Sequence, residues 1–366
     1  MNYQLEFISI QGFRSLADVE LHVQPLNVLI GPNGAGKSNF VELFTFVREV
    51  IEERLQTYVA KRGGADKLLF YGSKRTKQLN ITLWFPPNGY SLVLEPTDDD
   101  RLVFAREYCA FQTGNNSPEP YKENLARTGD RESGLARDVR DTNYGVSHYV
   151  QKVLQDWRVY HFHDTSREAA VKKLQDVEDA HFLKPDAANL APFLRWLSMK
   201  HPKHYKMLLH SIRGVLPFFK EFIFRSSPFN EKQMRLEWQD KHSDIVFTGQ
   251  DLSDGSLRFI CLATLLLQPE LPSVVLLDEP ELGLHPTAIE ALSRLLKQAA
   301  ARTTVIVSTQ SVNLVSTCAP EDVVVVDRDV QGASTLRRLE PQQLMQWLDE
   351  YSLGELWEKN VIGGKP

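Results

Sequence analysis

The sequence predicts an α/β fold, and three observations support this. An apolar stretch of strand character, Pro25–Ile30, leads through a glycine-rich turn into Asn39–Leu55, where apolar residues recur at helical spacing. A second apolar stretch, Ser273–Leu277, ends in two adjacent acids. A third, Val305–Val307, ends in a polar turn. Buried strands that alternate with helices in this way are typical of a largely parallel sheet with helices packed against it.

The turn after the first strand, Gly31–Ser38, reads GPNGAGKS and matches the phosphate-binding pattern G-x-x-x-x-G-K-[ST]. Its glycines let backbone N–H groups converge on one point, and the start of the following helix adds partial positive charge. Lys37 is expected to reach the β- and γ-phosphates and Ser38 to hold Mg²⁺. A glycine-rich turn that binds nothing is the alternative, but strand, loop, Lys-Ser pair and helix are all present. The expected ATP contacts are Asn33, Gly34, Ala35, Gly36, Lys37, Ser38 and Asn39.

The composition is that of an ordinary globular protein: among 366 residues, 42% are hydrophobic and 24% are charged. A formal net charge of −5 argues against a protein that coats nucleic acid with its whole surface, although it allows a local basic patch. The scattered Cys109, Cys261 and Cys318 favour a reducing cytoplasm over a disulfide framework or a zinc site. No signal peptide and no membrane segment are expected, because the first residues alternate like a strand and no apolar stretch reaches about 18 residues.

The region 1–111 is expected to combine an N-terminal antiparallel β part with the phosphate-binding loop. Five stretches alternate apolar and polar residues, as half-buried strands do: Leu5–Ile10, Val19–Val23, Leu79–Phe85, Tyr90–Leu94 and Leu102–Phe111. Arg14 follows the first of these strands. It is predicted either to contact the nucleotide or to be simply solvated.

The middle of the chain predicts a loop followed by helices. Residues 112–145 are polar and rich in glycine and charge, which indicates a mobile loop; a DNA contact is one interpretation of it and plain solvation the other. Val146–Trp157 is expected as a helix and Arg158–Phe162 as a strand. Glu168–Ser211 is predicted to be wholly helical, which gives an inserted, mainly helical lobe near residues 165–230.

The stretch His161-Phe162-His163-Asp164 lies where that strand enters the lobe. Two imidazoles and a carboxylate are good metal ligands. Residues i and i+2 share a strand face only loosely, however, and no further His or Cys cluster is near in the sequence. The sequence alone therefore gives little support for a metal site here.

The second half of the site is expected in residues 231–340. Asp278 would bind Mg²⁺ through water and Glu279 would polarise the attacking water, whereas a strand that merely ends in a charged turn is the alternative. Upstream, Ser253 and Gly255 of LSDGS precede a predicted helix. They form either a second anion-binding helix start or a simple helix cap.

The order of GPNGAGKS, LSDGS, VVLLDEPELGLHP and VIVSTQS resembles that of ABC-type ATPase heads of the RecF/SMC group, in particular the compact bacterial proteins called AAA family ATPases. The resemblance implies a single P-loop NTPase head over 1–366 that binds ATP and Mg²⁺ and hydrolyses ATP. It also implies that two heads meet head-to-tail, each ATP lying between the P-loop of one and Ser253 and Gly255 of the other. Glu279 then acts as the base, and Glu281–His285 matches the D-loop that crosses the interface.

Three positions depart from the common family pattern. Gln310 stands at the switch position, where transporters usually have His. As a catalytic residue, Gln310 can hydrogen-bond the attacking water or the γ-phosphate, but it cannot take up a proton. No Gln matches the Q-loop, and His163 or Asp164 is the candidate for its role. In LSDGS, Asp254 replaces a glycine.

The function that the resemblance favours is ATP hydrolysis coupled to sensing or processing of nucleic acid such as DNA, in DNA repair or antiviral defence, with a partner effector such as a nuclease. The ATPase subunit of a membrane transporter is one alternative, which the missing Q-loop and the long insertion disfavour. An ATP-gated scaffold with little turnover is another. Asp327-Arg328-Asp329 has the D-x-D spacing of Toprim nucleases, but it equally fits a hairpin turn before Ser334–Leu339.

The C-terminal tail, residues 341–366, carries large apolar side chains beyond the last nucleotide motif: Leu344, Trp347, Leu348, Leu353, Leu356 and Trp357. That is too much apolar surface for a solvated end. The tail is expected either to pack back on the core of the head or to form a docking patch for the effector.

Overall fold

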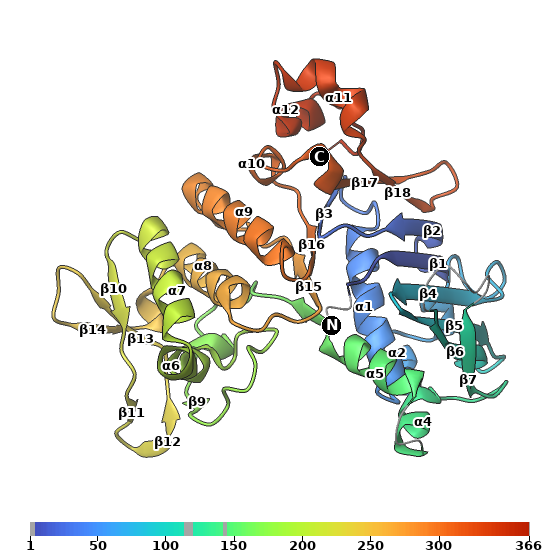
Figure 1. Ribbon diagram of the computed structural model, residues 1–366, viewed down its shortest axis with the longest axis horizontal. Coiled ribbons are helices and arrows are strands. Elements are labelled where there is room, and N and C mark those ends of the chain that lie inside the picture. The colour runs from blue at the N-terminus through green and yellow to red at the C-terminus, as the bar shows by residue number, and fades with distance from the viewer. Residues whose placement is uncertain (1–3, 113–119, 142–144, 366) are drawn as a thin grey trace.

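A computed structural model describes residues 4–112, 120–141 and 145–365, and its centre is a six-stranded sheet in the order β18–β17–β3–β16–β15–β8 (Figure 1). All neighbouring strands in it are parallel except β17 and β18, which form a hairpin. Their bounds are β3 Leu26–Ile30, β8 Arg158–Tyr160, β15 Val274–Asp278, β16 Thr304–Ser308, β17 Val323–Arg328 and β18 Ser334–Arg338. Because parallel strands end at one edge of a sheet, the segments after β3, β15 and β16 lie close together.

One face of this sheet packs against helices α1 (Lys37–Ile51) and α5 (Val146–Asp156), which in turn lie on the N-terminal antiparallel sheet. The antiparallel sheet has the order β2–β1–β4–β5–β6–β7. Its strands are β1 Phe7–Phe13, β2 Leu16–His22, β4 Leu79–Phe85, β5 Asn88–Pro96, β6 Leu102–Phe111 and β7 Tyr121–Ala126. Short helices α2 (Leu55–Lys61) and α3 (Ala65–Leu68) connect α1 to β4. Apart from β7, these strands lie where the sequence predicts them.

The opposite face packs against α8 (Asp254–Leu267), α9 (Pro286–Ala300) and the short helix α10 (Val312–Val315). Successive side chains of each buried strand point to opposite faces of the sheet. In β15, for example, Leu276 packs toward α1 and Leu277 toward α8. Such strands are apolar at nearly every position, which explains the continuous apolar stretches in the sequence.

The lobe beside α8 is mixed rather than mainly helical (Figure 1). Its helices are α6 (Leu190–Lys200) and α7 (Pro202–Val215), and its strands are β9 Gln175–Asp176, β10 Phe219–Phe222, β11 Ser226–Ser227, β12 Asn230–Met234, β13 Glu237–Asp240 and β14 Val246–Thr248. The prediction of continuous helix over Glu168–Ser211 is wrong for its first half. There the buried Asn189 side chain accepts from the Lys184 N–H and donates to the carbonyls of Asp179 and Phe182, which stabilises an irregular loop instead of helical turns.

The prediction of a loop over residues 112–145 is also wrong in part. The segment contains β7, which pairs with β6, and helix α4 (Leu135–Asp141); residues 113–119 and 142–144 lie outside the described residues. Buried Glu107 of β6 anchors this segment by accepting from the Ser133 hydroxyl and the Gly134 N–H. Only a few apolar residues, such as Leu125 and Leu135, reach the core. The polar composition therefore concealed both elements.

The tail forms α11 (Pro341–Leu348) and α12 (Leu353–Glu358) and packs back on the head. Leu353, Leu356 and Trp357 are buried, and α12 contacts α10, the helix that follows the polar turn after β16. Trp347 and Leu348 on α11 remain exposed. Most of the apolar surface of the tail thus belongs to the core. None of the helices in the described part of the chain combines the length and apolarity that a bilayer span requires.

Candidate active site

The loop Gly31–Ser38 connects β3 to α1 and depends on glycine at two positions where space and backbone conformation coincide. Gly36 has φ 118° and caps α1. A Cβ on Gly36 would lie 2.1 Å from Ser334 Oγ, and one on Gly31 would lie 2.0 Å from the Val326 carbonyl oxygen. The loop therefore lies directly against the β17–β18 hairpin, closer than any side chain would permit.

Ser15 and Ser334 support this loop from two distant parts of the chain. Ser334 Oγ lies 2.7 Å from Ser15 Oγ and 2.5 Å from the Ala35 carbonyl oxygen. Asn39 Nδ2 donates to Ser15 Oγ at 2.7 Å. Asn39, an expected nucleotide contact, thus uses its side-chain NH₂ group to support the loop. Neither serine belongs to a motif, so no local signal in the sequence indicates its role.

Lys37 lies among carboxylates at the edge of the parallel sheet. Its Nζ donates to the carbonyls of Gly31 at 2.6 Å and Pro32 at 3.2 Å. Burial lowers the pKa of Lys37 from its usual value, and the nearby carboxylates of Glu279, Asp278 and Glu281 oppose that shift. The phosphate-binding lysine and the acids after β15 thus share one site. The side chain of Ser38, the next residue, is exposed.

Asp278, the last residue of β15, and Glu279, which follows it, meet the end of β16, the strand between β15 and β3. Ser308 Oγ donates to Asp278 Oδ1 at 2.6 Å, and the Glu279 N–H donates to the Ser308 carbonyl at 2.8 Å. Glu279 has φ 42°, a left-handed conformation that is uncommon for non-glycine residues. Gln310 Nε2 donates to Glu279 Oε1. The two residues predicted as base and switch are therefore in direct contact.

Glu281 is a residue of this site whose individual role sequence reasoning missed. It is 7% exposed, and its Oε1 accepts from the Thr309 hydroxyl and the Gln310 N–H. Its Oε2 is buried without a hydrogen-bond partner among the described residues. Burial raises the pKa of Glu281 above its usual value, partly offset by the Thr309 bond. Glu281 thus connects the D-loop, 281–285, to the switch segment; its place as the last of the three acids in DEPE was its signal in the sequence.

Arg14 lies beside helix α1 and forms an ion pair with Glu42 of that helix. Its guanidinium lies 2.9 Å from the Glu42 carboxylate and 3.4 Å from Asn39 Oδ1. The backbone at Arg14 has φ 50° and donates to the Leu68 carbonyl. The structure therefore places Arg14 next to an expected nucleotide contact. Its contact with the nucleotide stays a prediction.

The signature residues begin α8, on the opposite face of the parallel sheet from α1. Ser253 caps the helix by accepting from the Ser256 N–H at 3.2 Å, as predicted, and Ser253 and Asp254 are exposed. Gly255 is in close contact with the D-loop, since a Cβ on it would lie 2.4 Å from the Gly283 carbonyl oxygen. The signature is therefore joined to the acids of the site through the D-loop.

Between the two candidates for the Q-loop role, the geometry favours His163. The ligand atoms of His161, His163 and Asp278 all lie within 4.8 Å of one another. Asp164 instead accepts from the Ser166 N–H in a local turn. The His pair thus faces the acids of the site, a proximity that the sequence separation of more than a hundred residues concealed.

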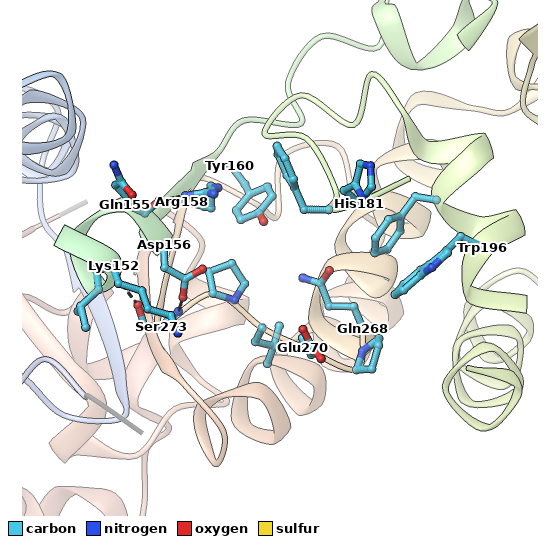
Figure 2. A pocket seen from close by; sticks show the side chains of 16 residues that line it. Lys152, Gln155, Asp156, Arg158, Tyr160, His181, Trp196, Gln268, Glu270 and Ser273 are labelled. Carbon is cyan, nitrogen blue, oxygen red and sulfur yellow. Dashed lines mark hydrogen bonds between the residues drawn. The ribbon is translucent and has the colours of Figure 1, made fainter. Parts of the chain in front are cut away.

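A cavity of about 590 Å³ lies away from these residues, between α5, β8 and α6 (Figure 2). Lys152 and Asp156 line one side, Tyr160 comes from β8, and Trp196 comes from α6. None of the phosphate-binding or acidic residues described above lines it. The candidate nucleotide site is instead the edge of the sheet where the P-loop, Asp278 and Glu279 meet.

The fold and this edge together define an ABC-type ATPase head of the RecF/SMC-like class. The model of the AAA_21 family, described as "AAA domain, putative AbiEii toxin, Type IV TA system", matches residues 26–316, and the chain belongs to this family. It is thus a P-loop ATPase that binds ATP.

Two solved structures and one curated relative add to this. An SMC head bound to the C-terminal winged-helix domain of ScpA is 15% identical with a TM-score of 0.62, covering 94% of this chain and 99% of that chain. An SMC head with an extended coiled coil, bound to the C-terminal domain of ScpA from Pyrococcus furiosus, is 15% identical with a TM-score of 0.52, covering 95% and 99%. At such identity these two matches show the fold alone.

The curated relative is an OLD nuclease of Thermus scotoductus, 22% identical over 317 residues. The match covers 80% of this chain but only 56% of that protein. The chain thus spans little more than half the length of the nuclease that it matches.

Proposed function

We propose that this ATPase head dimerises head-to-tail around two ATP molecules and couples their hydrolysis to sensing or processing of nucleic acid, together with an effector protein. The observation that carries the proposal is the exposed start of α8. Ser253 and Asp254 are open to solvent, on the face of the sheet opposite α1, although a signature is expected to contact a γ-phosphate. A second copy of the chain, with ATP bound in its P-loop, would supply such a phosphate.

Within one head, the loop N–H groups and Lys37 would bind the phosphates of ATP. The donor set beside them consists of the Ser38 hydroxyl and the Asp278 carboxylate, which are oxygen ligands of the kind that Mg²⁺ prefers. When bound, Mg²⁺ would neutralise charge on the β- and γ-phosphates. Glu279, oriented by Gln310, would accept a proton from the attacking water.

The effector and nucleic-acid part of the proposal is supported by the similarity to a nuclease longer than the matched segment. Asp327 and Asp329, the acids with Toprim-like spacing, are used for structure here. Asp327 Oδ2 accepts from the Gly364 N–H, and Asp329 Oδ1 accepts from the N–H groups of Gln331 and Ala333 in the β17–β18 turn. These contacts favour the hairpin interpretation, so any cutting chemistry is proposed to come from a partner.

Mixing two inactive variants tests the dimer. Ser253→Arg inactivates the signature of the head that carries it, and Lys37→Ala inactivates the P-loop of the head that carries it. A mixed dimer then has one doubly damaged site and one intact site, so mixing should restore part of the turnover that each variant lacks alone. Ser352→Arg is the matched control, because Ser352 caps α12 in the same manner but lies in the tail. An unrestored rate would contradict a signature that acts in trans.

Turnover measured with and without DNA separates this proposal from an ATP-gated scaffold. The coupled ATPase should accelerate on adding DNA, RNA or the effector. A rate that is negligible and unchanged under all these conditions would favour the scaffold instead.

A further inference from the structure

His161 and His163 lie next to Asp278 because their strands are neighbours. Strand β8 pairs with β15 in parallel, and Tyr160 is opposite Leu277. The next residue of each strand, His161 and Asp278, therefore emerges at the same edge of the sheet. The ligand atoms of the two histidines and the aspartate all lie within 4.8 Å of one another.

The backbone that carries the two imidazoles is fixed from both sides. Arg258 of α8 donates through Nε to the Phe162 carbonyl at 3.0 Å and through Nη2 to the His163 carbonyl at 3.2 Å. The His161 N–H donates to the Pro185 carbonyl at 2.9 Å. Phe162, between the histidines, is buried in the core. Little backbone freedom therefore remains to be lost when the imidazoles bind a ligand.

Two imidazoles and one carboxylate are a different donor set from that of Ser38 and Asp278. Mg²⁺ is a hard ion that binds almost entirely through oxygen and keeps several of its waters. Imidazole nitrogen suits divalent transition metals, and affinity for them generally rises from Mn²⁺ toward Cu²⁺. Three protein ligands at one edge leave further positions open for water or a phosphate oxygen.

We propose that His161, His163 and Asp278 form a binding site for a divalent transition-metal ion at the nucleotide-binding edge of the head. The site rests on the proposed function only in that the ion shares Asp278 with the ATP-bound metal. Because Arg258 also belongs to the signature helix α8, an ion held here would join β15, the β8 segment and the signature into one rigid unit.

Calorimetric titration of the nucleotide-free chain with Mn²⁺ tests the site directly, with the electron paramagnetic resonance signal of bound Mn²⁺ as a second readout. The parent should bind Mn²⁺, and His161→Ala/His163→Ala should lose at least about tenfold in affinity, since even the loss of an outer-shell partner of a metal ligand typically lowers affinity by roughly 10- to 100-fold. His242→Ala, at an exposed turn, should bind Mn²⁺ as the parent does.

A more conservative substitution keeps the test valid if the double alanine variant misfolds. His163→Gln keeps a polar side chain but offers an amide oxygen in place of imidazole nitrogen. This variant should therefore lower the affinity for Mn²⁺ more than the affinity for Mg²⁺. Mn²⁺ affinity that is absent in the parent, or equal in parent, double variant and His163→Gln, would overturn the site. The same titrations need no ATP, and ATP-dependent dimerisation in Mg²⁺ is measured separately. Failure of the metal site is thus distinguishable from failure of the proposed function.

Discussion

The P-loop half of the active site and its signature half are built differently. In the P-loop half, Lys37 is buried, Gly36 allows no side chain, and Ser15 and Ser334 support the loop from opposite ends of the chain. In the signature half, Ser253 is exposed, and among the described residues its side chain forms hydrogen bonds to Ser256, three positions away. One half is thus preorganised by its own chain, whereas the other is an exposed surface that is expected to need a second copy.

The two halves are nevertheless connected within one chain. Gly255 packs on the D-loop at Gly283, and Glu281 of the same loop accepts from Thr309 and from the Gln310 N–H. A change at the catalytic edge can therefore reach the signature through packed backbone. Substitutions in each half should accordingly separate ATP binding, hydrolysis and dimerisation.

The largest difference in effect, loss of ATP binding against loss of hydrolysis alone, is expected between Lys37→Ala and Glu279→Gln. Lys37→Ala removes positive charge that faces phosphate in both ground and transition states, so ATP binding should be lost. Glu279→Gln keeps the shape but cannot accept a proton, so binding should persist while hydrolysis falls at least a hundredfold, or about 3 kcal/mol of barrier. Binding is measured by calorimetry and hydrolysis by phosphate release. Turnover of Glu279→Gln at the parent rate would show that Glu279 is not the base.

A pair of glycine variants compares the two halves directly. Gly36→Ala combines a φ of 118° with a Cβ 2.1 Å from Ser334 Oγ, and strain of roughly 1–3 kcal/mol should weaken ATP binding about five- to 150-fold. Gly255→Ala has ordinary backbone angles but places its Cβ 2.4 Å from the Gly283 carbonyl oxygen, which should displace the signature and impair dimerisation. ATP affinity of the single chain should survive the second change only. Equal losses of affinity would contradict the division into two halves.

The smallest effect is expected at Glu281, between the halves. Burial raises the pKa of Glu281, so the folded protein holds this proton more tightly than the unfolded chain does. The resulting stabilisation is complete below the usual carboxyl range and is lost as pH rises through the raised pKa. Glu281→Gln removes this titration. The melting temperature of the variant minus that of the parent should therefore become more positive as the pH is raised from 4 to 8. Glu290→Gln, exposed on α9, is the control and should keep the pH profile of the parent.

How much the sequence could predict depended on the distance over which each feature is encoded. The P-loop, the acids after β15 and the helix cap Ser253 lie in continuous stretches whose strand or helix context is visible locally. The Ser15–Ser334 contact, by contrast, arises only when the hairpin β17–β18 packs beside β3, and no pattern announces it.

Two further features have the same cause. His161 and His163 lie beside Asp278 only through the pairing of β8 with β15, whereas the carboxylate that the sequence placed next to them, Asp164, accepts from the Ser166 N–H instead. In the lobe, the side chain of Asn189 replaces backbone hydrogen bonds, which made a polar, helix-compatible segment irregular. Tertiary partners, rather than local propensity, decided both cases.

If Ser253 acts on ATP bound by another copy of the chain, the mass of the protein in solution must depend on both ATP and Ser253. Light scattering should show Glu279→Gln as a dimer with ATP and as a monomer without it, because bound ATP is retained between the two heads. Ser253→Arg/Glu279→Gln should stay monomeric under both conditions, whereas Ser352→Arg/Glu279→Gln should dimerise. A mass that does not respond to ATP, and is the same with and without Ser253→Arg, would show that Ser253 does not join two heads around ATP.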